Sequence, residues 1–285
     1  MRYAYFPGCK IAHHLPAYGL SVQAVCSALN IDLEPVEFNC CGYPVRHESQ
    51  EAWALSAARN FALATRAGLP IMTPCKCCFG SLRHAQYWLE ANPGLRDTVT
   101  AELEGEGLQL PKEPVRVAHL LTVLDSDVGV QALTERAGDA LAGLRVAAHY
   151  GCHALRPGNV TEFDDPLNPT VFERLLCALG AEPVPWEMRL ECCGHPLRGR
   201  REAMSDALRQ RKMNSAAQAG AAVLATACTY CQMQFSHAPE TLSKNGPEAV
   251  LFSQLLGLAL GLPRESLGLA HDAPRTLARS GTVGQ

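Results

Sequence analysis

The sequence lacks the features that would place it in a membrane, on nucleic acid or in the secretory pathway. The most apolar run, residues 249–262, is shorter than the roughly 20 apolar residues that span a bilayer. The first residues, MRYAYFPGCK, contain no apolar segment of the kind that directs secretion. The net charge is −3, so no basic excess favours nucleic acid or an anionic membrane surface. We therefore expect a cytoplasmic protein.

Charged residues are also sparse, at 19% against 47% hydrophobic residues, which fits a globular protein with a substantial core. The 285 residues are enough for one large domain or two ordinary ones. Cysteine is abundant instead, with 13 residues. Because the chain is long and shows no export signal, a disulfide framework is disfavoured. The thiols are more typical of metal ligands or redox groups.

Ten of the 13 cysteines form two sets with one pattern: a single cysteine, an adjacent pair and a CxxC. The pair and the CxxC are separated by 33 residues in the first set and by 34 in the second. The sets are Cys9, Cys40, Cys41, Cys75 and Cys78, and Cys152, Cys192, Cys193, Cys228 and Cys231. Such a repeat implies two copies of one domain. We predict domains over residues 1–125 and 140–272, a linker over 126–139 and a mobile tail over 273–285.

Each group of cysteines follows a segment typical of a strand and precedes one typical of a helix. The expected strands span residues 3–6, 36–38, 71–73, 146–150, 184–190 and 222–225. The expected helices span residues 14–29, 51–67, 168–179 and 202–219, with apolar helical pieces at 117–124 and 250–260. Residues 92–114, rich in Gly, Pro and Glu, predict a linker or surface excursion.

This alternation predicts an α/β fold with two pseudo-symmetric repeats, each a small Rossmann-like parallel sheet with flanking helices. Loops at the carboxyl ends of parallel strands converge, so they bring the five cysteines of each set together. A structural zinc site takes four ligands, and a cubane [4Fe–4S] cluster needs only four thiolates. Five cysteines that include an adjacent pair therefore favour an iron–sulfur cluster of another shape. Zinc and redox-active disulfides are the alternatives.

The sequence resembles the CCG-domain family at several stretches that carry the cysteines. These are Tyr5 to Cys9, both Cys-Cys-Gly stretches, Cys75 to Cys78, Tyr150 to His153 and Thr226 to Met233. Within this family it is similar, over nearly the whole chain, to the B subunit of heterodisulfide reductases. The resemblance implies two noncubane [4Fe–4S] clusters. One is bound by Cys9, Cys40, Cys41, Cys75 and Cys78, and the other by Cys152, Cys192, Cys193, Cys228 and Cys231.

The resemblance also implies an oxidoreductase that acts on sulfur groups, cleaving or forming a disulfide or protein-bound sulfur substrate between the clusters. The implied partners are a ferredoxin-like C subunit together with a flavin-binding A subunit. The Ala-, Leu- and Arg-rich composition is typical of a bacterium of high GC content. Because related complexes of bacterial sulfur oxidisers act oxidatively on protein-bound sulfur, the composition favours a role in bacterial sulfur oxidation. One alternative is a CCG-type electron-transfer subunit of a lactate, glycolate or glycerol-phosphate dehydrogenase complex, although the ferredoxin run C-x2-C-x2-C-x3-C-P is absent. Another is a zinc-stabilised scaffold.

His153 and His195, next to cysteines of the second set, are the candidates for catalysis beyond the ligands. Each either packs behind the cysteines, donates a proton to a departing thiolate or hydrogen-bonds a cluster sulfur. Cys77, inside the first CxxC, is either idle, an alternative ligand or a contact to substrate. Arg46 and Arg198 follow their pairs at equal distance and either offset cluster charge or pair with a carboxylate.

Further residues complete the expectations for the surroundings of the cysteines. Cys26 and Cys177 lie on apolar helix faces, so we expect both to be core thiols. Gly42 and Gly194 follow the two pairs, where we expect them to permit close approach of the backbone. Lys76, between Cys75 and Cys77, is expected to be a solvated charge, with docking of an electron donor as the alternative.

Overall fold

The structure, a computed structural model, describes residues 1–236 and 246–270, which contain two parallel sheets of four strands each. The strands of the first sheet are β1 (Arg2–Tyr5), β2 (Asp32–Pro35), β3 (Ile71–Thr73) and β4 (Val117–His119). Those of the second are β5 (Arg145–Ala148), β6 (Glu182–Pro183), β7 (Val223–Thr226) and β8 (Glu248–Leu251). The orders β2-β1-β3-β4 and β6-β5-β7-β8 are equivalent, so the predicted α/β fold with two pseudo-symmetric repeats is confirmed.

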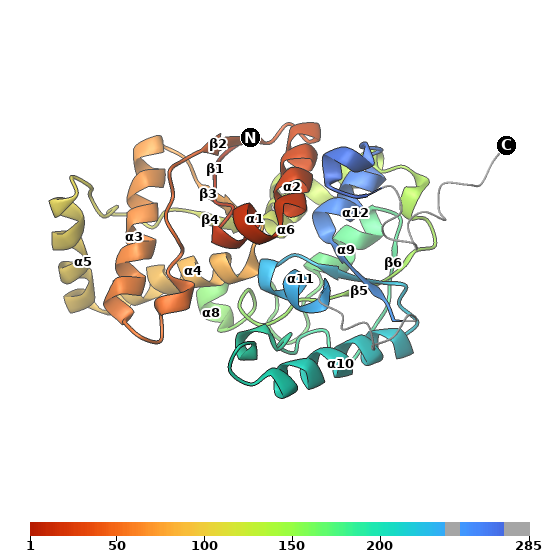
Figure 1. Cartoon of the computed structure of the whole chain (residues 1–285). Helices are drawn as coiled ribbons and strands as arrows, with labels where there is room; N and C mark the ends of the chain where they lie inside the picture. The colour runs from red at the N-terminus through yellow and green to blue at the C-terminus, as the bar shows by residue number, and fades with distance from the viewer. Residues whose placement is uncertain (237–245, 271–285) are drawn as a thin grey trace.

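Helices flank both sheets (Figure 1). In the first half they are α1 (Cys9–His14), α2 (Pro16–Ala28), α3 (Gln50–Ala67), α4 (Lys76–Ala91), α5 (Pro93–Gly105), α6 (Leu120–Thr122) and the π-helical turn η2 (Val123–Gly129). Then follow α7 (Val130–Arg136), α8 (Gly158–Thr161), α9 (Val171–Ala178), α10 (Glu202–Gln218), α11 (Thr229–Ser236) and α12 (Phe252–Ala259). Short 3-10 turns are η1 (Tyr43–Val45), η3 (Asp139–Leu141), η4 (His195–Leu197) and η5 (Arg264–Leu267). Among these described elements no helix has the length and apolar character needed to cross a membrane.

The longer helices confirm the helical predictions within about three residues. Ser49 caps α3 by accepting a hydrogen bond from the Ala52 amide, and Gly68 ends it in the left-handed conformation, with φ of 66°. The helix expected over residues 14–29 begins earlier and is divided into α1 and α2 at Pro16, because proline lacks the amide that would continue the first helix.

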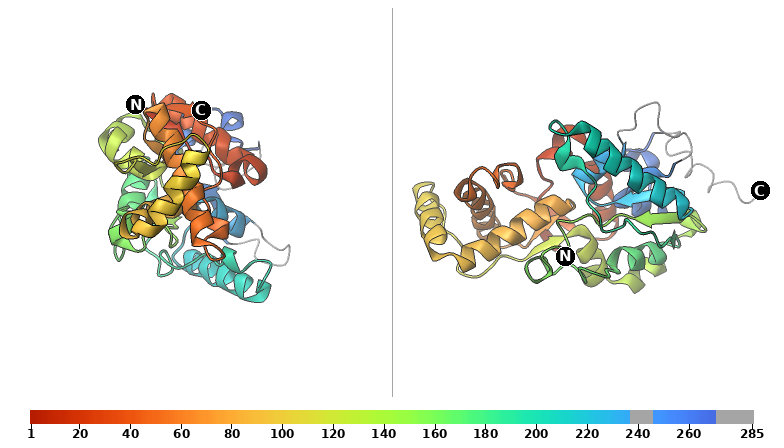
Figure 2. Two further views of the ribbon diagram at one scale, coloured as in Figure 1. Left: turned by 90° about the vertical axis from the view of Figure 1, so that its left-hand side faces the viewer. Right: turned by 90° about the horizontal axis from the view of Figure 1, so that it is seen from below.

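The two halves interlock through their helices. α2 of the first half packs on α12 of the second, while α9 of the second half packs on α6 and η2 of the first. The arrangement is reciprocal: α12, which follows β8, covers α2 of the first half, and α6, which follows β4, covers α9 of the second half. Figures 1 and 2 show α2 beside α12 and an elongated molecule in which α5 lies at the end remote from α12.

The limits of the predicted domains stay a prediction. α7 lies within the stretch expected to link them, residues 126–139, and it packs on α9. The expected mobile tail, residues 273–285, lies outside the described residues.

The second strand of each half lies earlier in the chain than predicted. Residues 36–38 and 184–190 follow β2 and β6 and form no strand. Phe38 instead packs its ring on that of Phe6, with centroids 5.1 Å apart. The apolar residues of both segments are therefore there to pack side chains, and they do not indicate a strand.

The prediction of a linker or surface excursion over residues 92–114 is wrong, because α5 occupies most of it. Leu95, Val99 and Leu103 recur every four residues and form a buried stripe, and α5 packs on α3. The polar remainder of the segment concealed this stripe in the sequence. Likewise, residues 117–124 and 250–260 begin with β4 and β8 before they become helical, so each sheet gains a fourth strand.

His119, the last residue of β4, ties the halves together. Its Nε2 lies 2.9 Å from the Pro74 carbonyl oxygen and 3.2 Å from that of Ala227, the residues directly before the two CxxC motifs. Its Nδ1 accepts a hydrogen bond from the Leu121 amide, so the proton of the neutral imidazole sits on Nε2 and is shared by both carbonyls. Burial lowers the pKa of His119 to about 3.

We predict that His119→Gln makes stability less sensitive to acid. Because the pKa of His119 is lower in the folded than in the unfolded state, its contribution is present above about pH 6.5 and disappears as the pH falls toward 3. Between about pH 7.5 and about pH 5.5, the free energy of unfolding of the parent chain should fall by about 1.4 kcal/mol more than that of the variant. Urea unfolding at both pH values measures this difference, and equal losses would contradict the role given to His119.

Candidate metal centre

The cysteines of both sets gather at the carboxyl ends of the parallel strands, as predicted. Cys9 begins α1 after β1, and Cys75 lies between β3 and α4. Cys152 and Cys228 hold the equivalent places after β5 and β7. The adjacent pairs directly precede η1 and η4. Helix N-termini therefore point toward the thiols and favour their ionised form.

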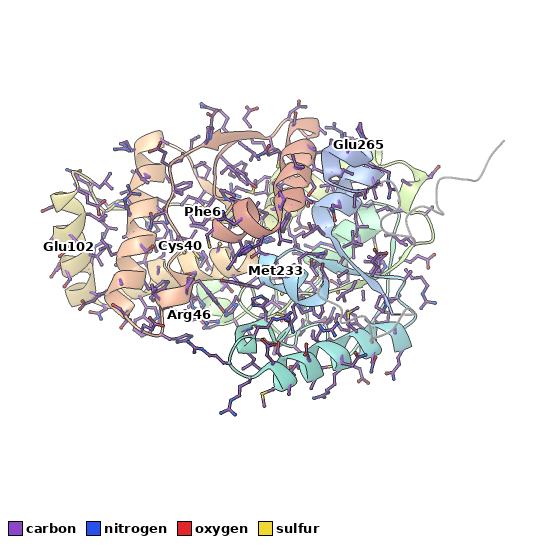
Figure 3. The ribbon with its side chains drawn as sticks, in the orientation of Figure 1. Phe6, Cys40, Arg46, Glu102, Met233 and Glu265 are labelled. Atoms are coloured by element: carbon purple, nitrogen blue, oxygen red, sulfur yellow. The ribbon has the colours of Figure 1, made fainter. Side chains whose placement is uncertain are left out.

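Two adjacent cavities lie at this place, and each is lined by one complete set of five cysteines. The first has a volume of about 280 Å³ and the second of about 350 Å³, counting space open to solvent. Tyr43, Cys77 and Tyr230 line both cavities, so these side chains lie at the boundary. The Cys77 and Cys228 sulfurs there are 3.6 Å apart. Figure 3 shows Cys40 beside α3 of the first half, where the Ser56 hydroxyl donates to its carbonyl.

Hydrogen bonds favour a thiolate at one sulfur of each adjacent pair. Cys40 donates to Cys41 and holds its pKa well below the usual value. In the second set, a hydrogen bond from Cys152 and a smaller contribution from Cys193 lower the pKa of Cys192 to about 2.

All 13 cysteines are free thiols. Over residues 1–236 and 246–270, no three His, Cys, Asp or Glu side chains converge on a single metal ion.

His153 lies at the boundary, oriented toward sulfur. Its Nδ1 is 3.4 Å from the Cys77 sulfur and 3.8 Å from the Cys152 sulfur. Its Nε2 is 3.3 Å from both the Tyr43 hydroxyl and a guanidinium nitrogen of Arg46. Because a guanidinium only donates, Nε2 accepts and the proton of the neutral ring sits on Nδ1, facing the sulfurs. Burial, and after it the charge of Arg46, lowers the pKa of His153 to about 4.

His195 is placed differently, although it occupies a similar position in the sequence. Its ring stacks on Tyr230 with centroids 4.6 Å apart, and it is absent from the described lining of either cavity. Arg198 nearby lies 3.9 Å from the Glu202 carboxylate, which matches one of the two hypotheses for the arginines. The catalytic candidacy of both histidines stays a prediction.

The prediction that Lys76 is a solvated charge is wrong. Its side chain is only 2% exposed, and Nζ donates to the His149 carbonyl at 3.1 Å. The same nitrogen lies 4.7 Å from the ring centroid of Phe172. Lys76 belongs to the first half but lines the second cavity, because α4 begins at the interface between the halves.

The two cysteines expected to be core thiols differ in their surroundings. Cys26 is buried in α2, as predicted. Cys177 is exposed, so its assignment to the core is wrong. The reason is that α9 buries Phe172, Leu175 and Leu176 on another face, which leaves Cys177 toward solvent.

Gly80 in α4 is a site residue that the sequence analysis missed. A Cβ at this position would lie 2.2 Å from the carbonyl oxygen of His153, so only glycine lets the halves approach this closely. Glycine inside a helix costs stability, so it needs a reason to be there. A glycine two residues after a CxxC, in a segment that becomes helical, was the signal in the sequence that could have revealed this close approach. Gly42 and Gly194 have positive φ, and a Cβ would lie 2.6 Å and 3.1 Å from side chains of α3 and α10. Their predicted role in close approach is confirmed.

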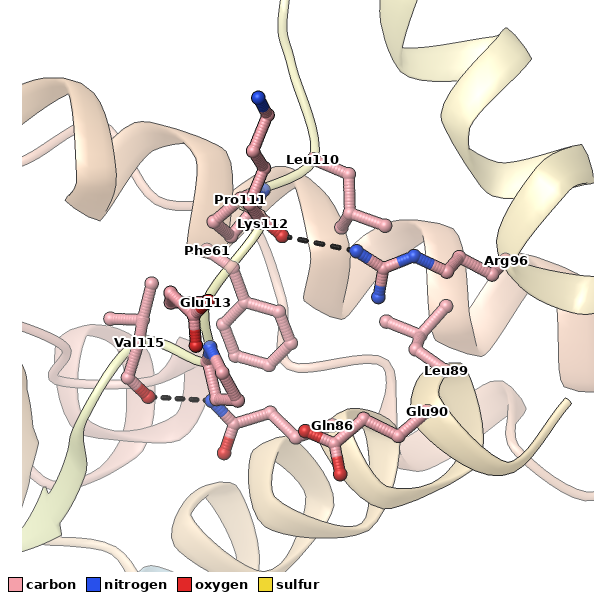
Figure 4. A pocket seen from close by; sticks show the side chains of 11 residues that line it. Phe61, Gln86, Leu89, Glu90, Arg96, Leu110, Pro111, Lys112, Glu113 and Val115 are labelled. Carbon is pink, nitrogen blue, oxygen red and sulfur yellow. Dashed lines mark hydrogen bonds between the residues drawn. The ribbon is translucent and has the colours of Figure 1, made fainter. Parts of the chain in front are cut away.

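Another cavity, of about 370 Å³, lies away from the cysteines, between α3, α4, α5 and residues 110–115 (Figure 4). Arg96 and Gln86 close it by donating to the carbonyls of Pro111 and Val115. Neither cysteine nor histidine is among its lining residues, so it takes no part in the sulfur site.

The chain belongs to the CCG family of cysteine-rich domains, whose family model matches residues 3–83 and 146–236. Each match contains one complete set of five cysteines, so the predicted family and the internal repeat are both confirmed.

Three curated relatives match almost from end to end. The chain is 35% identical, over 95% of its length and 96% of the relative's, to the 8-methylmenaquinol:fumarate reductase membrane anchor subunit of Wolinella succinogenes. It is 32% identical to an Archaeoglobus profundus protein named for its likeness to the B subunit of heterodisulfide reductase, with 96% of both chains covered. It is 29% identical to the B subunit of the ferredoxin/F(420)H(2)-dependent CoB-CoM heterodisulfide reductase of Methanosarcina acetivorans, over 94% and 92% of the two chains.

A solved structure shares the fold. A hypothetical protein from Helicobacter pylori superposes with a TM-score of 0.73 at 15% identity, over 94% of this chain. The present chain spans half the length of that protein. At this identity the likeness concerns the fold alone, and it supports the two-repeat architecture.

Replacing Gly80 by Ala should weaken the interface and reduce bound metal. The added Cβ would lie 2.2 Å from a backbone oxygen, so α4 or the loop at His153 has to move. We expect a destabilisation of about 1–3 kcal/mol, the usual cost of overpacking. Gly105→Ala is the matched control, because a Cβ there meets nothing within 4 Å. Thermal unfolding and metal content report both effects, and a Gly80 variant that behaves like the control would contradict this interpretation.

Proposed function

We propose that this chain is the iron–sulfur subunit of a heterodisulfide-reductase-like complex. In this proposal it cleaves or forms a disulfide or bound-sulfur substrate at two noncubane [4Fe–4S] clusters. The observation that carries the proposal is the division of ten thiols between two adjacent cavities, five to each. No carboxylate is among the described lining residues of either cavity, and an all-sulfur donor set suits iron–sulfur clusters. Zinc, with four ligands in structural sites, leaves a fifth thiol without a role.

The proposed ligands are the two complete sets. The first cluster is held by Cys9, Cys40, Cys41, Cys75 and Cys78, and the second by Cys152, Cys192, Cys193, Cys228 and Cys231. Backbone amides that donate to the adjacent pairs, such as Gly194 N to Cys192 Sγ at 3.4 Å, offset part of the negative charge of these thiolates. When bound, such clusters supply single electrons and iron sites that accept soft sulfur ligands.

The substrate position in this proposal is the boundary between the cavities, lined by Tyr43, Cys77 and Tyr230. Splitting a disulfide into two thiols consumes two electrons and two protons. His153 directs its Nδ1–H toward sulfur at this boundary and is the proposed hydrogen-bond donor to the departing thiolate, whereas the two protons come from solvent. Tyr43 and Arg46 hold the ring through Nε2 in the orientation that this hydrogen bond needs.

The proposed partners are a ferredoxin-like C subunit, which delivers or removes electrons, together with a flavin-binding A subunit. The relatives from Archaeoglobus and Methanosarcina are named after B subunits, which supports a role within a larger assembly. We further propose a cytoplasmic location. The composition favours the oxidative direction, as in bacterial sulfur oxidation.

A second candidate function is electron transfer in a quinol-linked complex. The relative from Wolinella, named as a subunit of an 8-methylmenaquinol:fumarate reductase, favours it at 35% identity. In this candidate a quinol donates the electrons, and no disulfide is cleaved or formed. It shares the two cysteine-lined sites with the first candidate, so only the response to substrate separates the two.

The test is a titration of the anaerobically purified chain with the CoB–CoM disulfide, with glutathione disulfide and with a soluble menaquinol analogue. We expect a disulfide or its thiol products to change the visible and electron paramagnetic resonance spectra, because sulfur binds beside the clusters. The menaquinol analogue should leave the spectra of the oxidised chain unchanged. Spectra that respond to the quinol and to no disulfide or thiol would contradict the first function and support the second.

A further inference from the structure

Two lysines are buried beside the second set of cysteines. Lys212 is 0% exposed and Lys76 is 2% exposed. Within the described residues neither forms an ion pair with a carboxylate. Burial lowers the pKa of Lys212 to about 8, and the thiols of Cys231 and Cys193 oppose this shift. The ammonium form therefore prevails at neutral pH, and a buried charge of this kind requires an anionic group nearby.

The internal repeat supplies the matched position in the first half. Cys41 and Gly68 are each 152 residues before their counterparts Cys193 and Gly220, and the same spacing relates Asn60 to Lys212. The amide nitrogen of Asn60 lies 3.4 Å from the carbonyl oxygen of residue 39, and Lys212 Nζ lies 3.0 Å from that of residue 191. Both side chains thus hold the residue directly before an adjacent cysteine pair. One of them is neutral and the other is a cation.

The start of α4 and α11 shows the same difference in charge. Lys76 follows the first cysteine of its CxxC, and Thr229 occupies the equivalent position in the second half. Each side chain reaches across to the other half: Lys76 lines the second cavity, and Thr229 Oγ1 lies 3.1 Å from the Cys75 sulfur. The second site therefore receives a buried ammonium where the first receives a neutral hydroxyl.

The backbone contribution to the potential is matched between the sites. Backbone amides donate to both cysteines of each pair, from Gly42 and Tyr43 in the first half and from Gly194 and His195 in the second. Lys10, which lines the first cavity, is partly exposed, so water and salt screen its charge. The two buried ammonium groups are shielded from water and salt, so their charges are screened less than that of Lys10.

We propose that Lys212, together with Lys76, makes the second set of cysteines the site of the more easily reduced cluster. The inference rests on the proposed function, since it requires a cluster at each site. Each one-electron reduction adds one negative charge to a group already surrounded by five thiolates. A nearby buried cation stabilises that charge, and among the described residues a buried lysine, Lys76, lines the second cavity while none lines the first. In a singly reduced molecule the electron therefore resides in the second half.

The test is a potentiometric titration of the full chain with dithionite, followed by visible absorbance and electron paramagnetic resonance. We compare the parent with Lys212→Asn, which installs the residue of the first half, and with Lys212→Arg, which keeps the charge. Asn60→Lys adds the charge to the first site. Lys112→Asn removes an exposed lysine beside the cavity of Figure 4 and is the matched control.

We expect two separate reduction potentials in the parent and in the control. Lys212→Asn should lower the higher potential and leave the lower one in place, whereas Lys212→Arg restores the gap. Asn60→Lys should raise the lower potential. If Lys212→Asn loses its metal, the shift in Asn60→Lys tests the inference instead. Coincident potentials in the parent, or an unchanged gap in the variants with both clusters bound, would overturn the inference. A chain without two clusters would instead overturn the proposed function, so the two failures are distinguishable by iron content.

Discussion

The packing of ten cysteine sulfurs at one place is the constraint on which the rest of the structure depends. The sulfurs converge where two parallel sheets end, and Cys77, which belongs to neither set, lies 3.6 Å from Cys228 of the second. Each of these sulfurs that ionises requires compensation for its negative charge. The fold supplies it through backbone amides at the cysteine pairs, through helix N-termini and through two buried ammonium groups.

The interlocking of the halves serves the same constraint. α2 and α12, and α9 with α6, cover one another where the two halves meet, so neither site is complete without side chains of the other half. Lys76 and Thr229 each reach the opposite site. The repeat gives the two sites one geometry, and a few unequal positions give them different chemistry. Cys77 occupies the position that Tyr230 has in the second half, and Asn60 the position of Lys212.

The sequence was sufficient for the pattern of cysteines, the parallel sheets and the convergence of thiols at the strand ends. Periodicity failed in two places. Val36 and Phe38 have the alternation of a strand but pair with no strand, and the buried stripe of α5 is hidden among polar residues. It also failed wherever a side chain acts across the interface. Lys76, Gly80 and His119 each contact a residue of the other half that lies more than 70 positions away, and no local pattern reports such contacts.

The most direct test of the central claim is the content of iron, acid-labile sulfide and zinc in the full chain purified without oxygen. Two sites of five thiols, each holding a four-iron cluster, predict about eight irons and about eight sulfides per chain, without zinc. About four of each would mean that only one half binds a cluster, which contradicts a substrate position between two. Zinc without sulfide would contradict the iron–sulfur assignment altogether.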